Sequence, residues 1–293
     1  MSRSTIRIAQ AQFAPSLRTD ESLQKVERLF AQAHEQGADL LALPEMFCCP
    51  YDTTLFAAYA EFEGGRVWKF CSELAKKYGM YLSAGSVPED DNQGHLYNTG
   101  WVFDRDGKMI ARHRKMHLFD IDIPAGVTFR ESDSLDAGDT ATVFDTEFGC
   151  LGLCVCYDIR FPELLRLMTL AGARMVICPA AFNTTTGPLH WELVFRSQAV
   201  LNQVAIVGTA PALNTKSVYH SWGHSIIVDA WANVISQLDE HEALQVTDLD
   251  LDTVDVARRQ LPLLRQRRTD AYKLVSIDGK GDGQMAAPEA ARK

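Results

Sequence analysis

The stretch LGLCVCYDIRFPEL, residues 151–164, decides the fold of this chain. Its first residues alternate between large and small side chains with a period of two, which indicates a strand. Pro162 suits the first turn of a helix, because its missing N–H has no helical partner there. Cys156 therefore falls at a strand-to-helix turn, at the carboxyl end of a predicted sheet.

A side chain at such a turn is well placed for chemistry. The turn brings backbone N–H groups close to the side chain, and these groups can stabilise an oxyanion. Cys156 is thus a candidate nucleophile. A free cysteine more often serves as a small buried hydrophobic residue, so this segment alone leaves both interpretations open.

Composition limits the function classes that fit. The chain has 293 residues, room for one large domain or two small ones, and a net charge of −9 argues against a broad nucleic-acid surface. No apolar run approaches the ~20 residues that span a bilayer, and the first residues lack the apolar core of a signal peptide. Seven cysteines are too few for a disulfide scaffold of this length. We expect a cytoplasmic protein that binds neither nucleic acid nor a membrane.

Strand and helix patterns alternate in the first half of the chain and again from residue 150 onward, which predicts an α/β fold with helix-covered sheets. The expected strands are 6–13, 39–43, 80–87, 99–103, 109–112, 151–155, 174–178, 204–209, 223–229, 234–237 and 243–249. The expected helices are one capped by Thr19 or Asp20 and ended by Gly37, one over 67–78, one from Phe161 to Gly172, and one over 188–201.

No linker rich in Pro, Gly or Ser divides residues 1–275, which we interpret as one domain. The tail 276–293 is rich in Gly, Asp, Ala and Lys, and we expect it to be disordered. The arginines of residues 258–268 are most simply a solvated face or a subunit contact.

Three further residues are candidates for chemistry. Glu45 follows an apolar strand, and burial raises a carboxyl pKa into the range of a general base or acid. Lys115 lies in a basic run, where an ammonium could lower a thiol pKa and stabilise an oxyanion. Glu131 could hydrogen-bond Lys115 and fix its position. Taken singly, each is also typical of an ordinary loop or surface residue.

Other constellations are weaker. The chain has no G-x-S-x-G elbow and no glycine-rich nucleotide loop. His113 and His117 would need a helix to ligate a metal together, and that segment is predicted to be extended, so we expect no metal site. A Cys–His dyad stays open, because the sequence does not say which histidine is near Cys156. The candidates are His190, His220 and His224.

Four patches, taken together and in this order, resemble the nitrilase (carbon–nitrogen hydrolase) superfamily. They are LALPEMF around Glu45, RKMHLFD around Lys115, TFRES around Glu131 and CYDIRFPEL around Cys156. The match continues through 182–192 and 222–225 and ends near 267–272, which leaves out only the tail. The resemblance implies a four-layer α-β-β-α sandwich that forms a homodimer and needs no metal or organic cofactor.

Within that superfamily the chain is most similar to the omega-amidase branch, on the phrases HLFDIDIPAGVTFRES (117–132) and AFNTTTGPLHWELVFRS (181–197). That branch hydrolyses the terminal amide of 2-oxoglutaramate and 2-oxosuccinamate and releases ammonia. Alternatives are an amidase of deaminated glutathione, an N-carbamoyl amino acid hydrolase, and a scaffold protein that kept the fold. Two departures, Cys48-Cys49 and Ala125, affect loop shape rather than the catalytic assignment.

The resemblance assigns roles to the four candidates. Cys156 is the nucleophile, Glu45 the general base and then acid, and Lys115 the electrostatic partner of the oxyanion, helped by a backbone N–H near Tyr157. Glu131 anchors Lys115.

A dicarboxylate monoamide also carries a distal carboxylate, which needs a cation or several donors. The candidates for this contact and for the pocket walls are Tyr51, Phe129, Arg130, Tyr157, Arg160, Phe182, Thr185 and Thr186. Arg160 could instead pair with Asp158 or Glu163.

Overall fold

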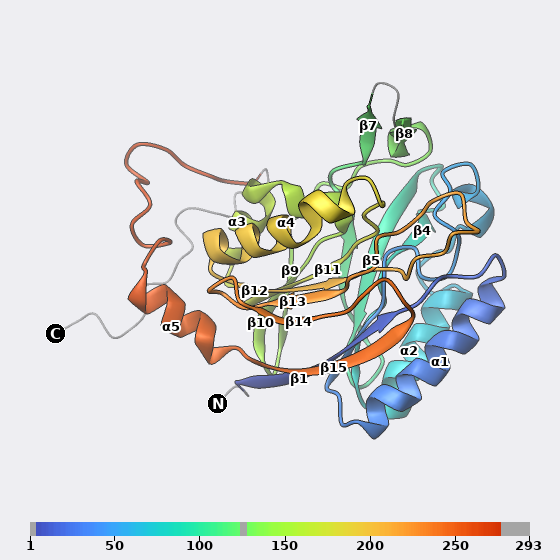
Figure 1. Cartoon of the computed structure of the whole chain (residues 1–293), viewed down its shortest axis with the longest axis horizontal. Coiled ribbons are helices and arrows are strands. Elements are labelled where there is room, and N and C mark those ends of the chain that lie inside the picture. Colours follow the sequence, from blue (N-terminus) through green and yellow to red (C-terminus); the bar gives the residue numbers. More distant parts are fainter. Residues whose placement is uncertain (1–3, 124–127, 277–293) are drawn as a thin grey trace.

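The computed structural model describes residues 4–123 and 128–276, and its strands form two large sheets packed face to face (Figure 1). The first sheet has the order β15-β1-β2-β3-β5-β4, with β6 paired to the other edge of β5. Its strands are β1 (Thr5–Gln12), β2 (Leu40–Ala42), β3 (Tyr81–Ser83), β4 (Val87–Asp90), β5 (Leu96–Phe103), β6 (Met109–Arg114) and β15 (Ala243–Asp250).

The second sheet has the order β14-β13-β12-β11-β10-β9. In both sheets the central strands are parallel, because helices provide the crossovers between them. The strands are β9 (Thr142–Thr146), β10 (Gly149–Leu153), β11 (Met175–Pro179), β12 (Ala205–Thr209), β13 (Ile226–Val228) and β14 (Val234–Gln237).

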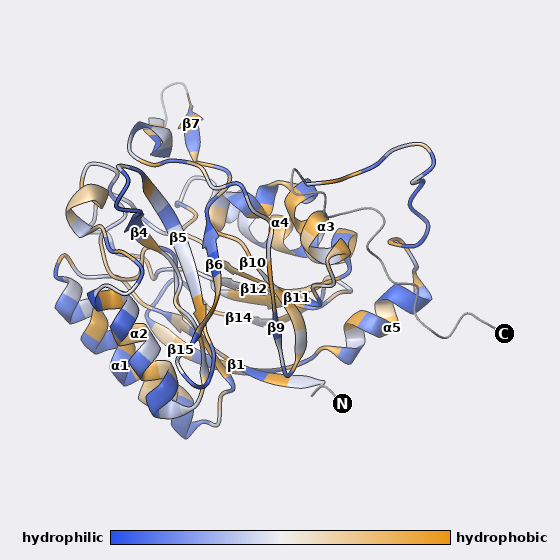
Figure 2. Ribbon diagram, turned by 180° about the vertical axis from the view of Figure 1, so that it is seen from behind, coloured by the Kyte–Doolittle hydropathy of each residue, from blue (hydrophilic) through white to orange (hydrophobic). Residues whose placement is uncertain are grey.

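Two helices cover the outer face of each sheet. Helices α1 (Thr19–Glu35) and α2 (Arg66–Tyr78) lie on the first sheet, and α3 (Pro162–Leu170) and α4 (Gly187–Asn202) lie on the second (Figure 1). The helices are banded with polar and apolar residues in Figure 2, as expected of helices that bury one face. The predicted α-β-β-α order of layers is confirmed.

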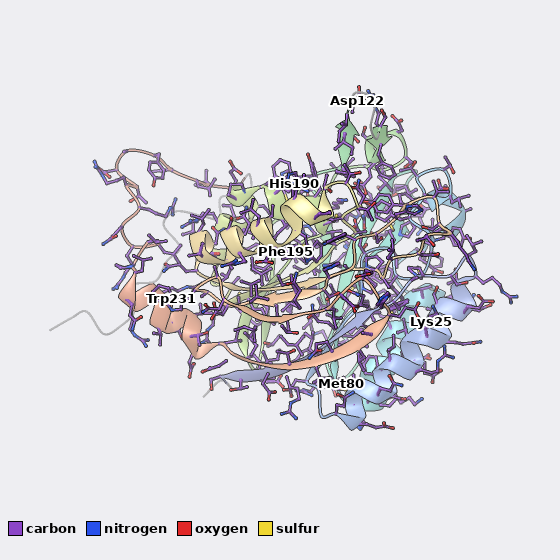
Figure 3. The ribbon with its side chains drawn as sticks, viewed as in Figure 1. Lys25, Met80, Asp122, His190, Phe195 and Trp231 are labelled. Carbon is purple, nitrogen blue, oxygen red and sulfur yellow. The ribbon has the colours of Figure 1, made fainter. Side chains whose placement is uncertain are left out.

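Apolar side chains fill the space between each pair of layers. Ile8 of the first sheet and Leu153 and Val207 of the second belong to one buried cluster between the sheets. Phe195 projects from α4 onto the second sheet (Figure 3), and a Cβ at Gly208 would lie 2.3 Å from its ring. Gly208 is therefore required by the close approach of α4 to β12.

Most predicted elements are present, with shifted ends. The expected strand 80–87 is divided into β3 and β4 by a turn at Gly85, whose φ is +52°. A Cβ there would lie 2.0 Å from the Pro44 carbonyl oxygen, so only glycine fits at this turn. The prediction that Thr19 or Asp20 caps the first helix is wrong, because the N-cap is Arg18, which makes no side-chain cap. The expected strand 223–229 begins only at Ile226.

Some elements were not predicted. Strands β7 (Asp120–Asp122) and β8 (Thr128–Arg130) form a two-stranded ribbon that projects beyond the sandwich (Figure 1). Helix α5 (Asp252–Gln260) follows β15. Its Arg258 donates to the carbonyl oxygens of Ala173 and Gln203, which corrects the prediction of a solvated arginine face at this position.

The described helices include none with the length and apolar character needed to cross a membrane. The tail predicted to be disordered lies outside the described residues, apart from Ser276.

Candidate active site

The four candidate catalytic side chains meet where strands of both sheets end. Glu45 follows β2, Lys115 directly follows β6, and Glu131 opens the 3₁₀ helix η2 (Glu131–Asp133). Cys156 opens the 3₁₀ helix η3 (Cys156–Arg160), two residues beyond the end of β10. All four are buried, and Cys156 is the most accessible at 4% exposed.

The Glu45 carboxylate is held from four sides. Its Oε1 accepts hydrogen bonds from Asn98 Nδ2 at 2.8 Å, Lys115 Nζ at 3.1 Å and Tyr51 Oη at 3.3 Å. Its Oε2 accepts the backbone N–H of Ala181 at 2.8 Å. Burial raises the pKa of Glu45, although the Lys115 ammonium opposes the shift. The carboxylate is thus a stronger base than an exposed glutamate.

Lys115 is enclosed by carboxylates. Its Nζ lies 2.7 Å from Glu131 Oε2 and 3.1 Å from Glu45 Oε1. Burial alone would lower the pKa of Lys115, but the two carboxylates outweigh it and raise the pKa, so the side chain stays an ammonium. Glu131 is fixed in turn by the backbone N–H of Phe119 at 2.7 Å and by the Tyr51 hydroxyl.

Cys156 occupies a strained turn beside this cluster. Its φ is +48°, in the left-handed region that residues with a Cβ rarely adopt and that often occurs at functional sites. Burial and, after it, the nearby Glu45 carboxylate raise the pKa of Cys156. The resting group is therefore a thiol next to a base, rather than a free thiolate.

A small pocket opens beside the Cys156 thiol. Half of its lining residues are aromatic, and one is a cation. The lining residues are Phe119, Cys156, Tyr157, Arg160, Ala181, Phe182, Thr186 and Tyr219.

Four predicted substrate contacts, Tyr157, Arg160, Phe182 and Thr186, therefore lie at the pocket. Thr185, the neighbour of Thr186, does not line it. The other predicted contacts lie elsewhere.

Tyr51 does not line the pocket, and its hydroxyl contacts Glu45 and Glu131. Phe129 packs against the ring of Tyr51, with ring centroids 5.7 Å apart. Arg130 is exposed on β8 and does not line the pocket.

Arg160 is the cation of this pocket. Its guanidinium lies 4.4 Å from the centroid of the Phe182 ring, and its Nη1 lies 3.2 Å from His190 Nδ1. Its Nε is buried and has no hydrogen-bond partner among the described residues. The described ion pairs include none from Arg160 to Asp158 or Glu163, because Asp158 is bonded to His113 and His117 instead.

The histidines considered as partners of Cys156 are engaged elsewhere or do not line this pocket. His190 contacts Arg160, and His224 Nδ1 lies 2.7 Å from the carbonyl oxygen of Trp222. His220 is exposed. The base that acts on the pKa of the Cys156 thiol is the Glu45 carboxylate.

Sequence reasoning missed two contributors to the site. Asn98 donates to Glu45 from the middle of β5, where its only signal is a polar residue in an otherwise apolar run. Tyr219 packs against Tyr51 with tilted rings whose centroids are 4.5 Å apart, and its hydroxyl donates to the Ala181 carbonyl. It lies in a long loop, and nothing in its sequence context distinguishes it.

The sequence pattern of carbon–nitrogen hydrolases matches residues 6–259, and the chain belongs to the carbon–nitrogen hydrolase family, within the nitrilase superfamily. It is a hydrolase of carbon–nitrogen bonds. The chain is 43% identical over 273 residues to the omega-amidase NIT2 of Mus musculus, covering 93% of this chain and 99% of the mouse protein.

Two further proteins are similar. Nitrilase homolog 2 of Dictyostelium discoideum is 44% identical over 259 residues, covering 88% of this chain and 79% of that protein. The crystal structure of Saccharomyces cerevisiae Nit3, a member of branch 10 of the nitrilase superfamily, superimposes with a TM-score of 0.84 at 37% identity, covering 91% of this chain and 98% of Nit3.

Proposed function

We propose that this protein is an omega-amidase, which hydrolyses the terminal amide of 2-oxoglutaramate and 2-oxosuccinamate to the 2-oxo dicarboxylate and ammonia. The observation that carries the proposal is the position of Arg160. It brings a cation with an unsatisfied N–H to the wall of the pocket that holds the Cys156 thiol. Four similar vertebrate proteins that are named omega-amidase support the same activity.

The first half of the reaction forms a thioester. The Cys156 sulfur attacks the amide carbon while Glu45 takes the thiol proton. The carbonyl oxygen becomes an oxyanion, which the Lys115 ammonium and a backbone N–H near Tyr157 stabilise; one such donor is typically worth ~3–4 kcal/mol. Glu45 then gives its proton to the departing nitrogen, the carbon–nitrogen bond breaks, and ammonia leaves.

The second half returns the enzyme to its resting state. Glu45, again a carboxylate, takes a proton from a water molecule that attacks the thioester carbon. A second oxyanion forms against the same donors. Its collapse releases the carboxylic acid, and the Cys156 sulfur recovers its proton from Glu45. Glu131 takes no part in proton transfer, because its two oxygens are bonded to Lys115, Phe119 and Tyr51.

The distal carboxylate of the substrate is bound by Arg160. Burial lowers the pKa of Arg160, which means that its charge is poorly solvated without an anion. A carboxylate would supply charge-assisted hydrogen bonds, including one to the unsatisfied Nε. The aromatic walls formed by Phe119, Tyr157 and Phe182 leave little room for a long acyl chain, which favours a short dicarboxylate over deaminated glutathione.

We further propose that the protein is a cytoplasmic homodimer with no nucleic-acid or membrane partner. Three leucines on the outward side of α4 support the dimer, since exposed apolar patches often mark interfaces. Leu189, Leu193 and Leu201 are 70%, 62% and 51% exposed. Light scattering of the purified protein should give the mass of a dimer, and Leu193→Glu should give the mass of a monomer.

A substrate panel tests the activity. We expect ammonia release from 2-oxoglutaramate to exceed release from deaminated glutathione and from an N-carbamoyl amino acid. Arg160→Met should raise KM for 2-oxoglutaramate by about 30-fold, as expected for a lost charge-assisted pair worth ~2 kcal/mol. Activity on a short neutral amide should change little.

The matched control is Arg130→Met, since Arg130 is exposed outside the pocket, and it should behave like the wild type. Faster turnover of deaminated glutathione than of 2-oxoglutaramate would replace the proposal by the sibling amidase activity. Release of carbon dioxide together with ammonia would indicate an N-carbamoyl amino acid hydrolase.

A further inference from the structure

Asp158 is a fully buried carboxylate that the mechanism above does not use, although it lies two residues after the nucleophile. Its Oδ2 accepts the backbone N–H of Val155 at 3.0 Å and faces His113 Nε2 at 2.9 Å. Its Oδ1 accepts the backbone N–H groups of Met116 at 3.2 Å and His117 at 2.9 Å, and faces His117 Nδ1 at 2.8 Å.

These five contacts come from two segments only. Val155 immediately precedes Cys156, and Met116 immediately follows Lys115. The two segments follow strands of different sheets, Val155 after β10 of the second sheet and Met116 after β6 of the first. Asp158 therefore fastens the backbone beside the nucleophile to the backbone beside the ammonium.

The donors to Asp158 are themselves fixed. His113 is buried on β6, and its Nδ1 lies 2.9 Å from Thr142 Oγ1 on β9. The ring of His117 stacks on Phe161, with centroids 3.6 Å apart and an interplanar angle of 8°. A side chain whose partners are locked by packing can hold a site to within a fraction of an ångström.

The charge of Asp158 is also maintained. Burial alone would raise the pKa of this carboxyl, but the hydrogen bonds from His113 and His117 outweigh it and hold the pKa well below its usual range. The group is therefore an ionised acceptor at neutral pH, and its contacts are charge-assisted.

The turn that carries Cys156 needs such an anchor. Cys156 has a left-handed backbone conformation, which persists only when surrounding contacts impose it. The same turn carries the backbone N–H of Tyr157, which the mechanism above assigns to the oxyanion. If Val155 and the Lys115 segment were released, the turn would relax, and the thiol, the ammonium and this N–H would lose their common geometry.

We propose that Asp158 is a positioning residue for amide hydrolysis, which locks the Cys156 turn to the Lys115 segment so that the nucleophile faces the carbon, and the oxyanion donors the oxygen, of one substrate carbonyl group. The reaction in this inference, amide hydrolysis, rests on the proposed function, whereas the contacts of Asp158 do not depend on it.

Asp158→Asn tests the proposal, because it keeps the size of the side chain and removes its charge and part of its accepting capacity. We expect kcat for 2-oxoglutaramate to fall by about 100-fold, the effect of an error of about 1 Å in the site. KM should change less than kcat, since the described contacts of the Arg160 guanidinium are to His190, Tyr157 and Phe182 rather than to Asp158. Alkylation of Cys156 by iodoacetamide, followed by mass spectrometry, should slow by about 10-fold.

Asp229→Asn is the matched control. Asp229 is also a buried aspartate that accepts backbone N–H groups, from Trp231 and Asn233, but it lies at the turn between β13 and β14, away from the site. This variant should lose thermal stability but keep kcat and the alkylation rate. The proposal is overturned if Asp158→Asn loses as much Tm as the control yet keeps kcat within about threefold of the wild type.

A second pair keeps the test valid if Asp158→Asn does not fold. His113→Phe removes one of the five donors and should lower kcat by about 10-fold, the value of one hydrogen bond to a charged group. His113→Gln restores an N–H toward Asp158 and should recover most of that loss. Equal kcat in both variants would contradict the proposal. Because alkylation needs no substrate, it still tests Asp158 if the wild type hydrolyses another amide.

Discussion

The turns after β2 and β10 each hold one reacting side chain in position, but they do so through different contacts. Each strand is followed by a non-glycine residue in the left-handed region, Met46 with φ +52° and Cys156 with φ +48°, and each turn presents one reacting side chain. Glu45 is held through its side chain by four donors. Cys156 is held through its backbone, by a turn that Asp158 fastens.

The difference follows from what each group must do. Glu45 passes a proton back and forth, so its pKa has to be set, and hydrogen bonds and charges around the carboxylate set it. The Cys156 sulfur must form and break a bond, so its side chain has to stay free of tight contacts. Changes around Glu45 should therefore move the pH dependence, whereas changes around the Cys156 turn should lower the rate at every pH.

Removal of the base should have the largest effect on the rate. Glu45→Gln keeps the shape of the side chain but has no carboxylate to take the thiol proton. We expect kcat to fall by about 10³-fold, within the range for loss of a general base. Glu61→Gln is the control, because Glu61 is a partly buried glutamate outside the site and should keep wild-type kcat. A loss of less than about tenfold in Glu45→Gln would exclude it as the base.

Removal of the negative charge at Glu131, beside the base, should change the pH dependence of kcat/KM. The Glu131 carboxylate raises the pKa of Glu45, so Glu131→Gln should lower that pKa. Since Glu45 must be ionised to act, the acidic limb of kcat/KM against pH should move to lower pH. The weaker hold on Lys115 should lower the plateau by about tenfold. An acidic limb displaced to higher pH would contradict this account of the Glu45 environment.

Loss of one neutral hydrogen-bond donor should have the smallest effect on kcat/KM, and it should move the acidic limb in the opposite direction to Glu131→Gln. Asn98→Ala removes a 2.8 Å hydrogen bond to the Glu45 carboxylate, which favours the protonated form and raises its pKa. The acidic limb should move to higher pH, and kcat/KM at the plateau should fall only about fivefold, which corresponds to about 1 kcal/mol, the net value of a typical hydrogen bond. If Asn98→Ala and Glu131→Gln moved the limb in the same direction, the pKa of Glu45 would not govern it.

The fold was largely predictable, because its elements rest on local signals. Alternation in β10, the amphipathic pattern of α2 and the Pro at the start of α3 are each readable in a few residues. Helix α5 was missed because only Val254 and Ala257 are buried in it, which is too little for a clear apolar stripe. The ribbon β7–β8 was missed because its strands are three residues each.

The site was predictable only in part. Cys156 has a local signal in the strand-to-helix turn, but the meeting of Glu45 with Lys115 depends on the packing of two sheets and was expected only from the family resemblance. Asn98 and Asp158 were missed as parts of the site, because their roles depend on partners 53 and 45 residues away in sequence, Glu45 and His113. The histidine pair that we considered as metal ligands is instead divided between the two oxygens of Asp158.

The account depends most on a covalent bond to one sulfur atom. Rapid acid quench of the enzyme during turnover of 2-oxoglutaramate, followed by mass spectrometry of the peptides, tests it directly. We predict a transient acyl adduct on the peptide that contains Cys156, which disappears when substrate is exhausted and is absent in Cys156→Ala together with all turnover. Wild-type turnover by Cys156→Ala, or an adduct on another residue, would contradict the account.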